Sequence, residues 1–297
     1  MNIPTRPSLS IIVNFFNMRR EAARTLHTLT PAYQRGVDAG RYEVVAIDNG
    51  STEPLDSRFV EGHGPNFRHL VVETDSPSPC AAINRAVSES TARDVMVCID
   101  GARMLSPGLL RYALAALDLY RNPFVYTLAM HVGHRPQNEL LAEGYCQDVE
   151  DDLLASVDWQ ADGYRLFSIS TKAYSSGRGY LGWLSESNCF ALRRADFLRL
   201  GGFDERFASA GGGLVNLDFF NQANGTPEIS PVMLLGEATF HQFHGGVATN
   251  VPMSEHPWKR MVAEYEGIRG IPFETVKRTP ELYGWLSPGS HQGLVSF

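Results

Sequence analysis

Cysteine is scarce in this chain, and long apolar runs are missing. The 297 residues include four cysteines, at positions 80, 98, 146 and 189, and none are paired at the spacing of a metal-binding motif. Few and scattered thiols are typical of a reducing compartment and argue against a disulfide framework. No stretch approaches the roughly 18 apolar residues of a membrane helix, and the first residues lack an apolar leader. We therefore expect a cytoplasmic protein without a transmembrane segment.

An excess of basic residues is also missing. The chain carries 26 Lys and Arg against 33 Asp and Glu, which gives a formal net charge of −7. An acidic chain offers no extended positive surface, so we expect no nucleic-acid partner. Hydrophobic residues make up 43% of the chain and charged residues 20%, which is typical of a globular protein with a full core.

The most informative stretch is the apolar segment 95–99 and the turn that follows it. Five apolar residues predict a strand buried on both faces, and Asp100 stands at its carboxyl end. Gly101 permits a sharp turn, and Ser106-Pro107 predicts the cap and first turn of a helix. Asp100 alone could be a turn residue. Ligands of open α/β sheets bind beyond the carboxyl ends of the strands, however, so Asp100 is also placed to hold a metal ion and, through it, a phosphate.

Strands and helices alternate along most of the chain. Segments typical of strands lie at 9–16, 42–47, 67–72, 95–99, 124–130, 187–192, 232–235 and 238–240. Apolar residues at helical spacing lie between many of them, and Asn17 is a candidate cap for the first helix. This order predicts an α/β protein with a doubly wound, mostly parallel sheet.

Two regions depart from this alternation. Residues 133–182 show weak periodicity, which is typical of loops, a lid or short helices. Their aromatic residues could line an acceptor site or belong to the core: Trp159, Tyr174, Tyr180 and, just beyond, Trp183. Beyond a main domain at 1–250, residues 251–297 predict a C-terminal helical extension, with a helix that begins at Pro257. This extension could pack against a second copy of the chain and form a homo-oligomer.

Several polar residues in the strand-end motifs each allow a plain and a functional interpretation. Asp48 begins Asp-Asn-Gly-Ser, which fits a tight turn or a contact with a nucleotide base. Asn84-Arg85 lies on the predicted helix before the central strand. Arg85 there has two interpretations: it could bind a phosphate, or it could lie on the solvated face of the helix. His241 and His244 precede Gly-Gly and could bind an ion or phosphate, or serve the structure alone. On an extended backbone they point to opposite faces, so they share an ion only if the chain turns between them.

The second half of the chain holds two further acidic candidates. The segment Gly-Gly-Phe-Asp-Glu at 201–205 ends a predicted helix, and capping alone explains its glycines. Asp204 in this segment could still accept a proton from an acceptor hydroxyl. Asp218, on the next predicted helix, is either a solvated or capping residue or a catalytic one.

The order of these motifs is more specific than any single one. A hydrophobic strand is followed by strand-Asp-Asn-Gly-Ser, Ala-x-Asn-x-Ala, Val-Cys-Ile-Asp and Arg-Arg-x-x-Phe-x-x-x-Gly-Gly-Phe-Asp-Glu. Across residues 8–245 this order resembles the family 2 inverting glycosyltransferases of the GT-A fold. The resemblance implies a GT-A-type sheet with a smaller acceptor-side subregion. On the donor side it implies a base contact for Asp48, nucleotide-side positions for Asp75 and Asn84, and the first metal-binding acid for Asp100. It also implies metal ligation for His241 or His244 and acceptor-side positions for Asp204 and Glu205.

The reaction implied by the resemblance is transfer of a sugar from a nucleotide-diphosphate sugar to a hydroxyl acceptor with inversion. Mn²⁺ or Mg²⁺ would be held by Asp100 and a late histidine, since oxygen and imidazole ligands suit these ions. The ion would stabilise the departing diphosphate as a Lewis acid. A carboxylate from the second half would deprotonate the acceptor hydroxyl. Asp218 is the first choice for this base, with Glu186 and Asp204 behind it.

The chain departs from the family pattern at two places. Ala102 stands where the second metal-binding acid is expected. The Glu-Asp pair that supplies the usual general base is not visible after Gly-Gly-Phe-Asp-Glu, and residues 211–218 stand in its place. These departures motivate a second hypothesis, a degenerate nucleotide-binding protein of the same fold without turnover. A nucleotidyltransferase is a weaker third, because residues 14–20 after the first strand contain no glycine for a phosphate loop.

Overall fold

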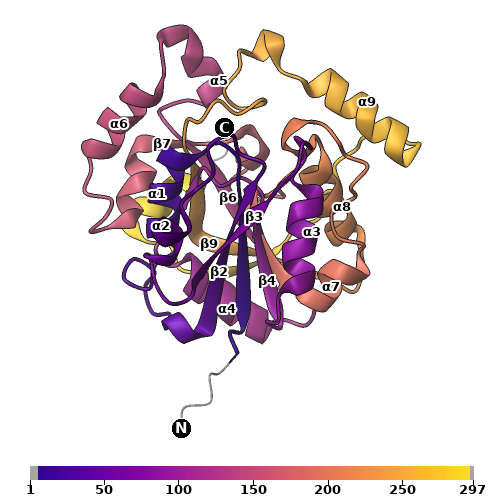
Figure 1. Ribbon diagram of the computed structural model, residues 1–297, viewed down its shortest axis with the longest axis horizontal. Coiled ribbons are helices and arrows are strands. Elements are labelled where there is room, and N and C mark those ends of the chain that lie inside the picture. The colour runs from indigo at the N-terminus through magenta and orange to yellow at the C-terminus, as the bar shows by residue number, and fades with distance from the viewer. Residues whose placement is uncertain (1–5, 295–297) are drawn as a thin grey trace.

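The computed structural model describes residues 6–294 and is built around one ten-stranded sheet (Figure 1). Its main strands, in spatial order, are β10 (Glu281–Gly284), β9 (Ser230–His241), β6 (Pro123–Val132), β8 (Cys189–Arg193), β4 (Asp94–Cys98), β1 (Leu9–Phe15), β2 (Tyr42–Asn49) and β3 (Phe67–Val72). Two short strands lie off this path. β5 (Arg103–Leu105) pairs with β9, and β7 (Ser170–Lys172) pairs with β6.

The parallel half of the sheet sets the position of the ligand crevice. β1 pairs in parallel with β2 on one side and with β4 on the other, and β2 pairs in parallel with β3. The chain therefore runs outward from β1 to β3 and then crosses back to β4, so the strand order reverses between β1 and β4. Such a reversal opens a crevice at the carboxyl ends of the two strands. β8 is antiparallel to both β4 and β6. Beyond it, β9 is parallel to β6, and β10 is parallel to β9. The predicted α/β class with a mostly parallel sheet is confirmed.

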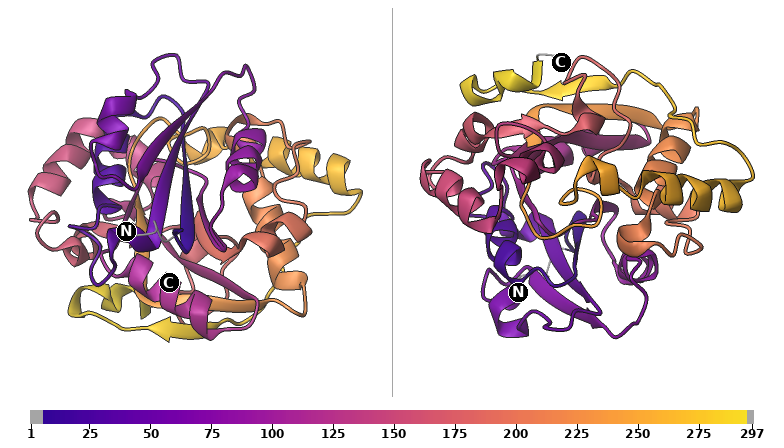
Figure 2. Two further views of the ribbon diagram at one scale, coloured as in Figure 1. Left: turned by 60° about the horizontal axis from the view of Figure 1, so that its bottom comes forward. Right: turned by 90° about the horizontal axis from the view of Figure 1, so that it is seen from above.

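Helices cover both faces of the sheet (Figures 1 and 2). Their bounds are α1 (Arg19–Thr28), α2 (Ser57–Glu61), α3 (Cys80–Glu89), α4 (Leu109–Leu119), α5 (Gln137–Leu140), α6 (Gln147–Ala155), α7 (Arg194–Arg199), α8 (Val215–Gly225) and α9 (Trp258–Arg269). Side chains alternate across β1: Ile11 and Val13 join the core cluster under α1 and α4, and Ile12 joins the one under α3, α7 and α8. Every helix of the described residues is too short or too polar to cross a bilayer.

Two predicted helix caps are wrong. Asn17 has a φ of 52°, and α1 begins after Met18 without a side-chain cap. The Asn17 side chain instead accepts a hydrogen bond from the backbone N–H of Thr52, so it joins the loops after β1 and β2. Ser106 does not cap α4, which begins after Gly108. The Ser106 hydroxyl instead donates a hydrogen bond to the carboxylate of Glu237 on β9. This carboxylate is buried, so it needs a donor from the protein in place of water.

The C-terminal third differs from the expected pattern in two further ways. The two segments expected at 232–235 and 238–240 form one strand, β9, which bends at Gly236 where φ is 85°. A Cβ there would lie 1.9 Å from the carbonyl oxygen of Trp285, so the close crossing of the C-terminal chain requires glycine. Residues 251–297 were expected to form a helical extension, yet β10 within them extends the main sheet along the outer edge of β9 (Figure 2, right). The division of the chain at residue 250 stays a prediction.

The weakly periodic region 133–182 contains α5, α6, β7 and short 3₁₀ turns. Trp159 and Tyr180 are buried and belong to the core, whereas Tyr174 is 60% exposed. The Trp183 ring faces two cations, since the Arg178 guanidinium lies 4.5 Å and the Lys277 ammonium 5.5 Å from its centroid.

The buried carboxylate of Glu237 predicts a pH-dependent stability. Burial raises its pKa to about 7, and hydrogen bonds from Ser106 and Tyr164 offset only part of that effect. The folded state therefore holds the proton more tightly than the unfolded chain, and the stability from this group falls as the pH rises from about 4.5 to about 7. Glu237→Gln should remove about 3 kcal/mol of pH dependence. Urea unfolding of both proteins between pH 5 and pH 8 measures this, and equal pH slopes would contradict it.

Candidate active site at the carboxyl ends of the strands

The three predicted metal ligands meet at the carboxyl edge of the sheet. Asp100 follows β4, His241 is the last residue of β9, and His244 lies in the turn beyond it. One ligand atom from each lies within 4.8 Å of the other two. The Asp100 carboxylate is 3.1 Å from Nε2 of His241 and 3.7 Å from Nε2 of His244, and the two Nε2 atoms are 3.2 Å apart.

The fold supplies the turn that the two histidines need. β5 runs antiparallel to β9 and places Arg103 opposite His241, so the segment after β4 folds back onto the end of β9. After His241 the chain turns, because the Asn250 side chain accepts hydrogen bonds from the backbone N–H groups of His244, Gly245 and Gly246. The imidazole of His244 is thereby turned back toward that of His241.

Gln137 fixes which nitrogen of His241 faces the cluster. Its amide N–H₂ donates to the carbonyl oxygen of His241, so its amide oxygen is the acceptor for Nδ1–H of His241 at 2.8 Å. With the proton on Nδ1, Nε2 presents a lone pair to the Asp100 carboxylate. Burial lowers the pKa of His241 to about 4, and Arg103 adds to this effect, so the ring is neutral near pH 7.

The residues present fit a divalent cation. The lone pair of His241 Nε2 and the carboxylate of Asp100 are both acceptors, and without a proton or a cation between them they repel. A carboxylate and neutral imidazoles are suitable ligands for Mn²⁺ and for other transition ions. A hydrogen bond from a ring's other nitrogen to an amide or carbonyl is the usual support for a metal-binding histidine.

Ala102 cannot supply a ligand from its position. Its side chain is fully buried in the apolar cluster under α1 and α4, and its backbone N–H donates to the Asp100 carboxylate at 3.0 Å. A carboxylate at this position would be buried among apolar side chains, which is unfavourable without a hydrogen-bonding partner. The charged neighbour of Asp100 is instead Arg103, whose Nε lies 3.3 Å from the carboxylate.

The predicted donor-side residues have structural contacts of their own. The buried Asp48 carboxylate accepts hydrogen bonds from the backbone N–H groups of Ser51 and Leu55, so it shapes the loop after β2. Asp75 is exposed in the loop after β3. The Asn84 amide bonds both backbone groups of Phe203, and Arg85 forms an exposed ion pair with Glu89. These contacts tie α3 to the Gly-Gly-Phe-Asp-Glu segment and do not bring Asn84 or Arg85 to the metal ligands.

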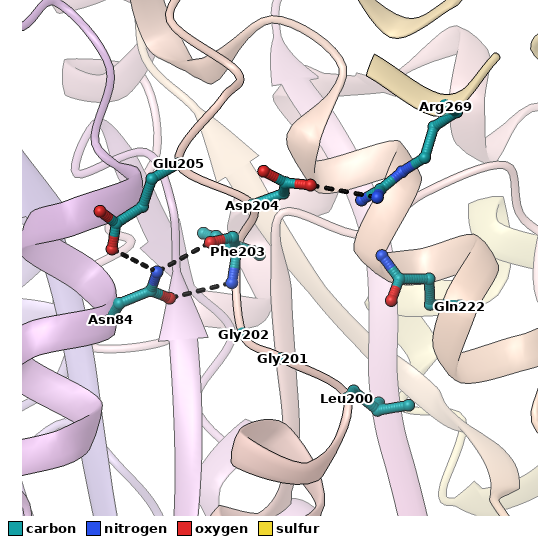
Figure 3. A pocket seen from close by; sticks show the side chains of 9 residues that line it. All are labelled: Asn84, Leu200, Gly201, Gly202, Phe203, Asp204, Glu205, Gln222 and Arg269. Carbon is teal, nitrogen blue, oxygen red and sulfur yellow. Dashed lines mark hydrogen bonds and ion pairs between the residues drawn. The ribbon is translucent and has the colours of Figure 1, made fainter.

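Asp204 and Asp218 are both bound by arginine. Arg269 donates to both oxygens of Asp218, at 2.8 and 2.5 Å. Its Nη1 also lies 3.1 Å from Oδ2 of Asp204 (Figure 3). Hydrogen bonds from Arg206 lower the pKa of Asp204 to about 2. Asp204 and Arg269 line a pocket of about 320 Å³ together with Asn84, Glu205 and Gln222 (Figure 3). The lowered pKa makes Asp204 a weak base, and the two hydrogen bonds from Arg269 occupy both oxygens of Asp218, which argues against both residues as the general base.

Glu186 is the third candidate, and it lies at the same end of the β4–β8 pair as Asp100. β8 is antiparallel to β4, with Cys189 opposite Cys98, and the N–H of Ile99 donates to the carbonyl of Asn188. Glu186 lies three residues before β8 and Asp100 two residues after β4, so both leave the same end of this antiparallel pair. Its carboxylate accepts one hydrogen bond, at 2.8 Å, from the amide of Asn216 at the start of α8.

Four residues of this site were missed by the sequence analysis. Arg103, Gln137, Asn216 and Asn250 act through contacts with residues far away in the sequence. None of them belongs to a motif. For Asn216 the position alone gave a signal, because it lies two residues before Asp218 in the segment that replaces the expected acidic pair.

Comparison with known proteins bears on the fold. No protein-family model matches the chain. Two proteins named validoxylamine A glucosyltransferase, from Streptomyces hygroscopicus subsp. limoneus and subsp. jinggangensis, are each 26% identical over 228 residues, or 74% of this chain. A crystal structure of S. aureus TarS 1–349 matches with a TM-score of 0.54 at 17% identity, over 79% of this chain and 60% of that one. Its complex with UDP-GlcNAc matches with a TM-score of 0.52 at 18% identity, over 87% and 66%.

The chain has a GT-A glycosyltransferase fold. The predicted resemblance is thus confirmed for the fold. The chain spans about half the length of the curated relatives it matches, 49% and 53%.

The role of Gln137 can be tested through metal binding. Gln137→Leu removes the acceptor that holds the proton on Nδ1 of His241, so the ring can turn or change tautomer. We expect Mn²⁺ affinity, measured with a nucleotide diphosphate present, to fall roughly 10- to 100-fold. Electron paramagnetic resonance of free Mn²⁺ measures this, with Gln292→Leu as a control away from the histidines. Unchanged affinity in a folded Gln137→Leu protein would show that the tautomer is set by other contacts.

Proposed function

We propose that this protein is a glycosyltransferase that moves a sugar from a UDP-sugar to a hydroxyl group of an acceptor with inversion at the anomeric carbon. The observation that carries the proposal is the cluster of Asp100, His241 and His244 at the crevice between β1 and β4. The relatives named as glucosyltransferases, and the similar TarS structures in complex with UDP and with UDP-GlcNAc, support the choice of donor.

On this proposal Asp100, His241 and His244 hold a divalent cation, Mn²⁺ or Mg²⁺, at the donor's diphosphate. When bound, the cation supplies Lewis acidity that stabilises the negative charge of the leaving diphosphate. Gln137 and Asn250 keep the two imidazoles in the ligating orientation. Asp48 keeps the loop after β2 in place at the nucleotide side of the crevice.

Glu186 is the proposed general base. Its carboxylate takes the proton of the acceptor hydroxyl as that oxygen forms a bond to the anomeric carbon. The bond between this carbon and the diphosphate oxygen breaks on the opposite face, so the configuration inverts. The amide of Asn216 orients the carboxylate without giving it a counter-charge, which leaves Glu186 free to accept a proton.

Donor use is tested by UDP release. The protein is incubated with UDP-glucose or UDP-GlcNAc and Mn²⁺, with and without simple sugar acceptors, and UDP is measured. We expect release with one donor, loss of release with EDTA, and loss in Asp100→Ala. UDP should also raise the melting temperature, because it binds only the folded state. A thermal shift with UDP but no release under any condition would instead identify a nucleotide-binding protein without turnover, the alternative that Ala102 suggests.

The choice of base is tested by two isosteric variants. Glu186→Gln should lower kcat roughly 10²- to 10⁴-fold while UDP binding stays the same, because the amide cannot accept the proton. Asp218→Asn should lower the melting temperature, since it leaves Arg269 without its full counter-charge, but should keep kcat within a few-fold in the folded fraction. Steady-state kinetics beside thermal melting measures both. The opposite pattern would assign the base to Asp218.

A further inference from the structure

Arg103 is the feature of the site that the proposed function leaves unexplained. It lies on β5 directly opposite His241, and its side chain is only 4% exposed. Its Nε and Nη1 atoms are buried, and neither has a hydrogen-bond partner within residues 6–294. The nearest carboxylate is Asp100, with Nε and Oδ2 3.3 Å apart.

A buried guanidinium with unpaired N–H groups is costly, and such groups normally have bidentate partners. Elsewhere in this chain Arg269 has such a partner in Asp218, whose two carboxylate oxygens accept from its Nε and Nη2. Arg103 has no comparable contact, so its place is not explained by stability. Its charge instead lies beside the metal ligands, 3.3 Å from the Asp100 carboxylate and directly across from His241 in the β5–β9 pair.

The charges of the cluster do not favour a divalent cation alone. The negative charge of Asp100 is matched by the positive charge of Arg103, and both imidazoles are neutral when they present lone pairs. A divalent cation at this place would add two positive charges close to a buried guanidinium, where repulsion is screened less than in water. A diphosphate brings the negative charge that balances the site.

We propose that Arg103 makes cation binding conditional on the nucleotide diphosphate: it opposes the cation alone and attracts the cation and the diphosphate as a pair. This inference rests on the proposed donor site. Its consequence is that the protein holds little metal between turnovers and gains it with the donor. By linkage, the cation must strengthen nucleotide binding by the same factor as the nucleotide strengthens cation binding.

The experiment measures Mn²⁺ affinity by electron paramagnetic resonance, without and with saturating UDP, after correction for Mn²⁺ bound to free UDP. In the wild type we expect weak binding without UDP and at least roughly 100-fold tighter binding with it. In Arg103→Met, binding without UDP should strengthen roughly tenfold or more, and the ratio of the two affinities should fall by a similar factor. Arg103→Lys keeps the charge and should keep the wild-type ratio.

Arg41→Met is the matched control, because Arg41 forms a half-exposed ion pair with Asp118 away from the cluster. Circular dichroism and thermal melting establish that each variant is folded. If Arg103→Met is not folded, Arg103→Gln takes its place. If UDP and Mn²⁺ bind but the ratio is the same in wild type and Arg103→Met, the role of Arg103 is refuted while the donor site stands. If neither UDP nor Mn²⁺ binds the wild type, the proposed function fails together with this inference.

Discussion

The site depends on acceptor atoms that face one another in a buried place. Nε2 of His241, with its proton held on Nδ1 by Gln137, points at the Asp100 carboxylate 3.1 Å away, and Nε2 of His244 is 3.2 Å from the same nitrogen. Lone pairs at these distances repel unless a cation or a proton lies between them. The turn after β9, the short strand β5 and the amide of Asn250 all hold the side chains in this arrangement.

The sheet explains how residues so distant in sequence come to share one site. Asp100 lies just after the switch-point strand β4, whereas the histidines come from the end of β9, three strands away along the sheet order. β5 bridges this gap, because it leaves the end of β4 and pairs with the end of β9. Gln242, between the histidines, donates its backbone N–H to Ala102 and its side-chain amide to the helix α1, so the bridge is fixed at both ends.

Short sequence patterns predicted the features that depend only on neighbouring residues. The apolar runs of β1, β2, β3 and β4 and the strand-end position of Asp100 were visible in the sequence, since each depends on a few adjacent residues. β10, the continuous β9 and the pairing of Arg103 with His241 were not, because they depend on partners far along the chain. Ser106 and Asn17 fit the composition of helix caps, but contacts with Glu237 and Thr52 decided their conformations.

The carboxylates of the second half show why residue type alone could not identify the base. Asp218 and Asp204 are acids at plausible positions, yet Arg269 and Arg206 neutralise them and hold α8, α9 and the Gly-Gly-Phe-Asp-Glu segment together. Glu186 has an amide as its partner, which orients a carboxylate without stabilising its charge as a guanidinium does. A general base must be held in position and must still be able to accept a proton. Among these three acids, the hydrogen-bond partner is therefore the reason to propose Glu186 as the base, although no motif marks this residue.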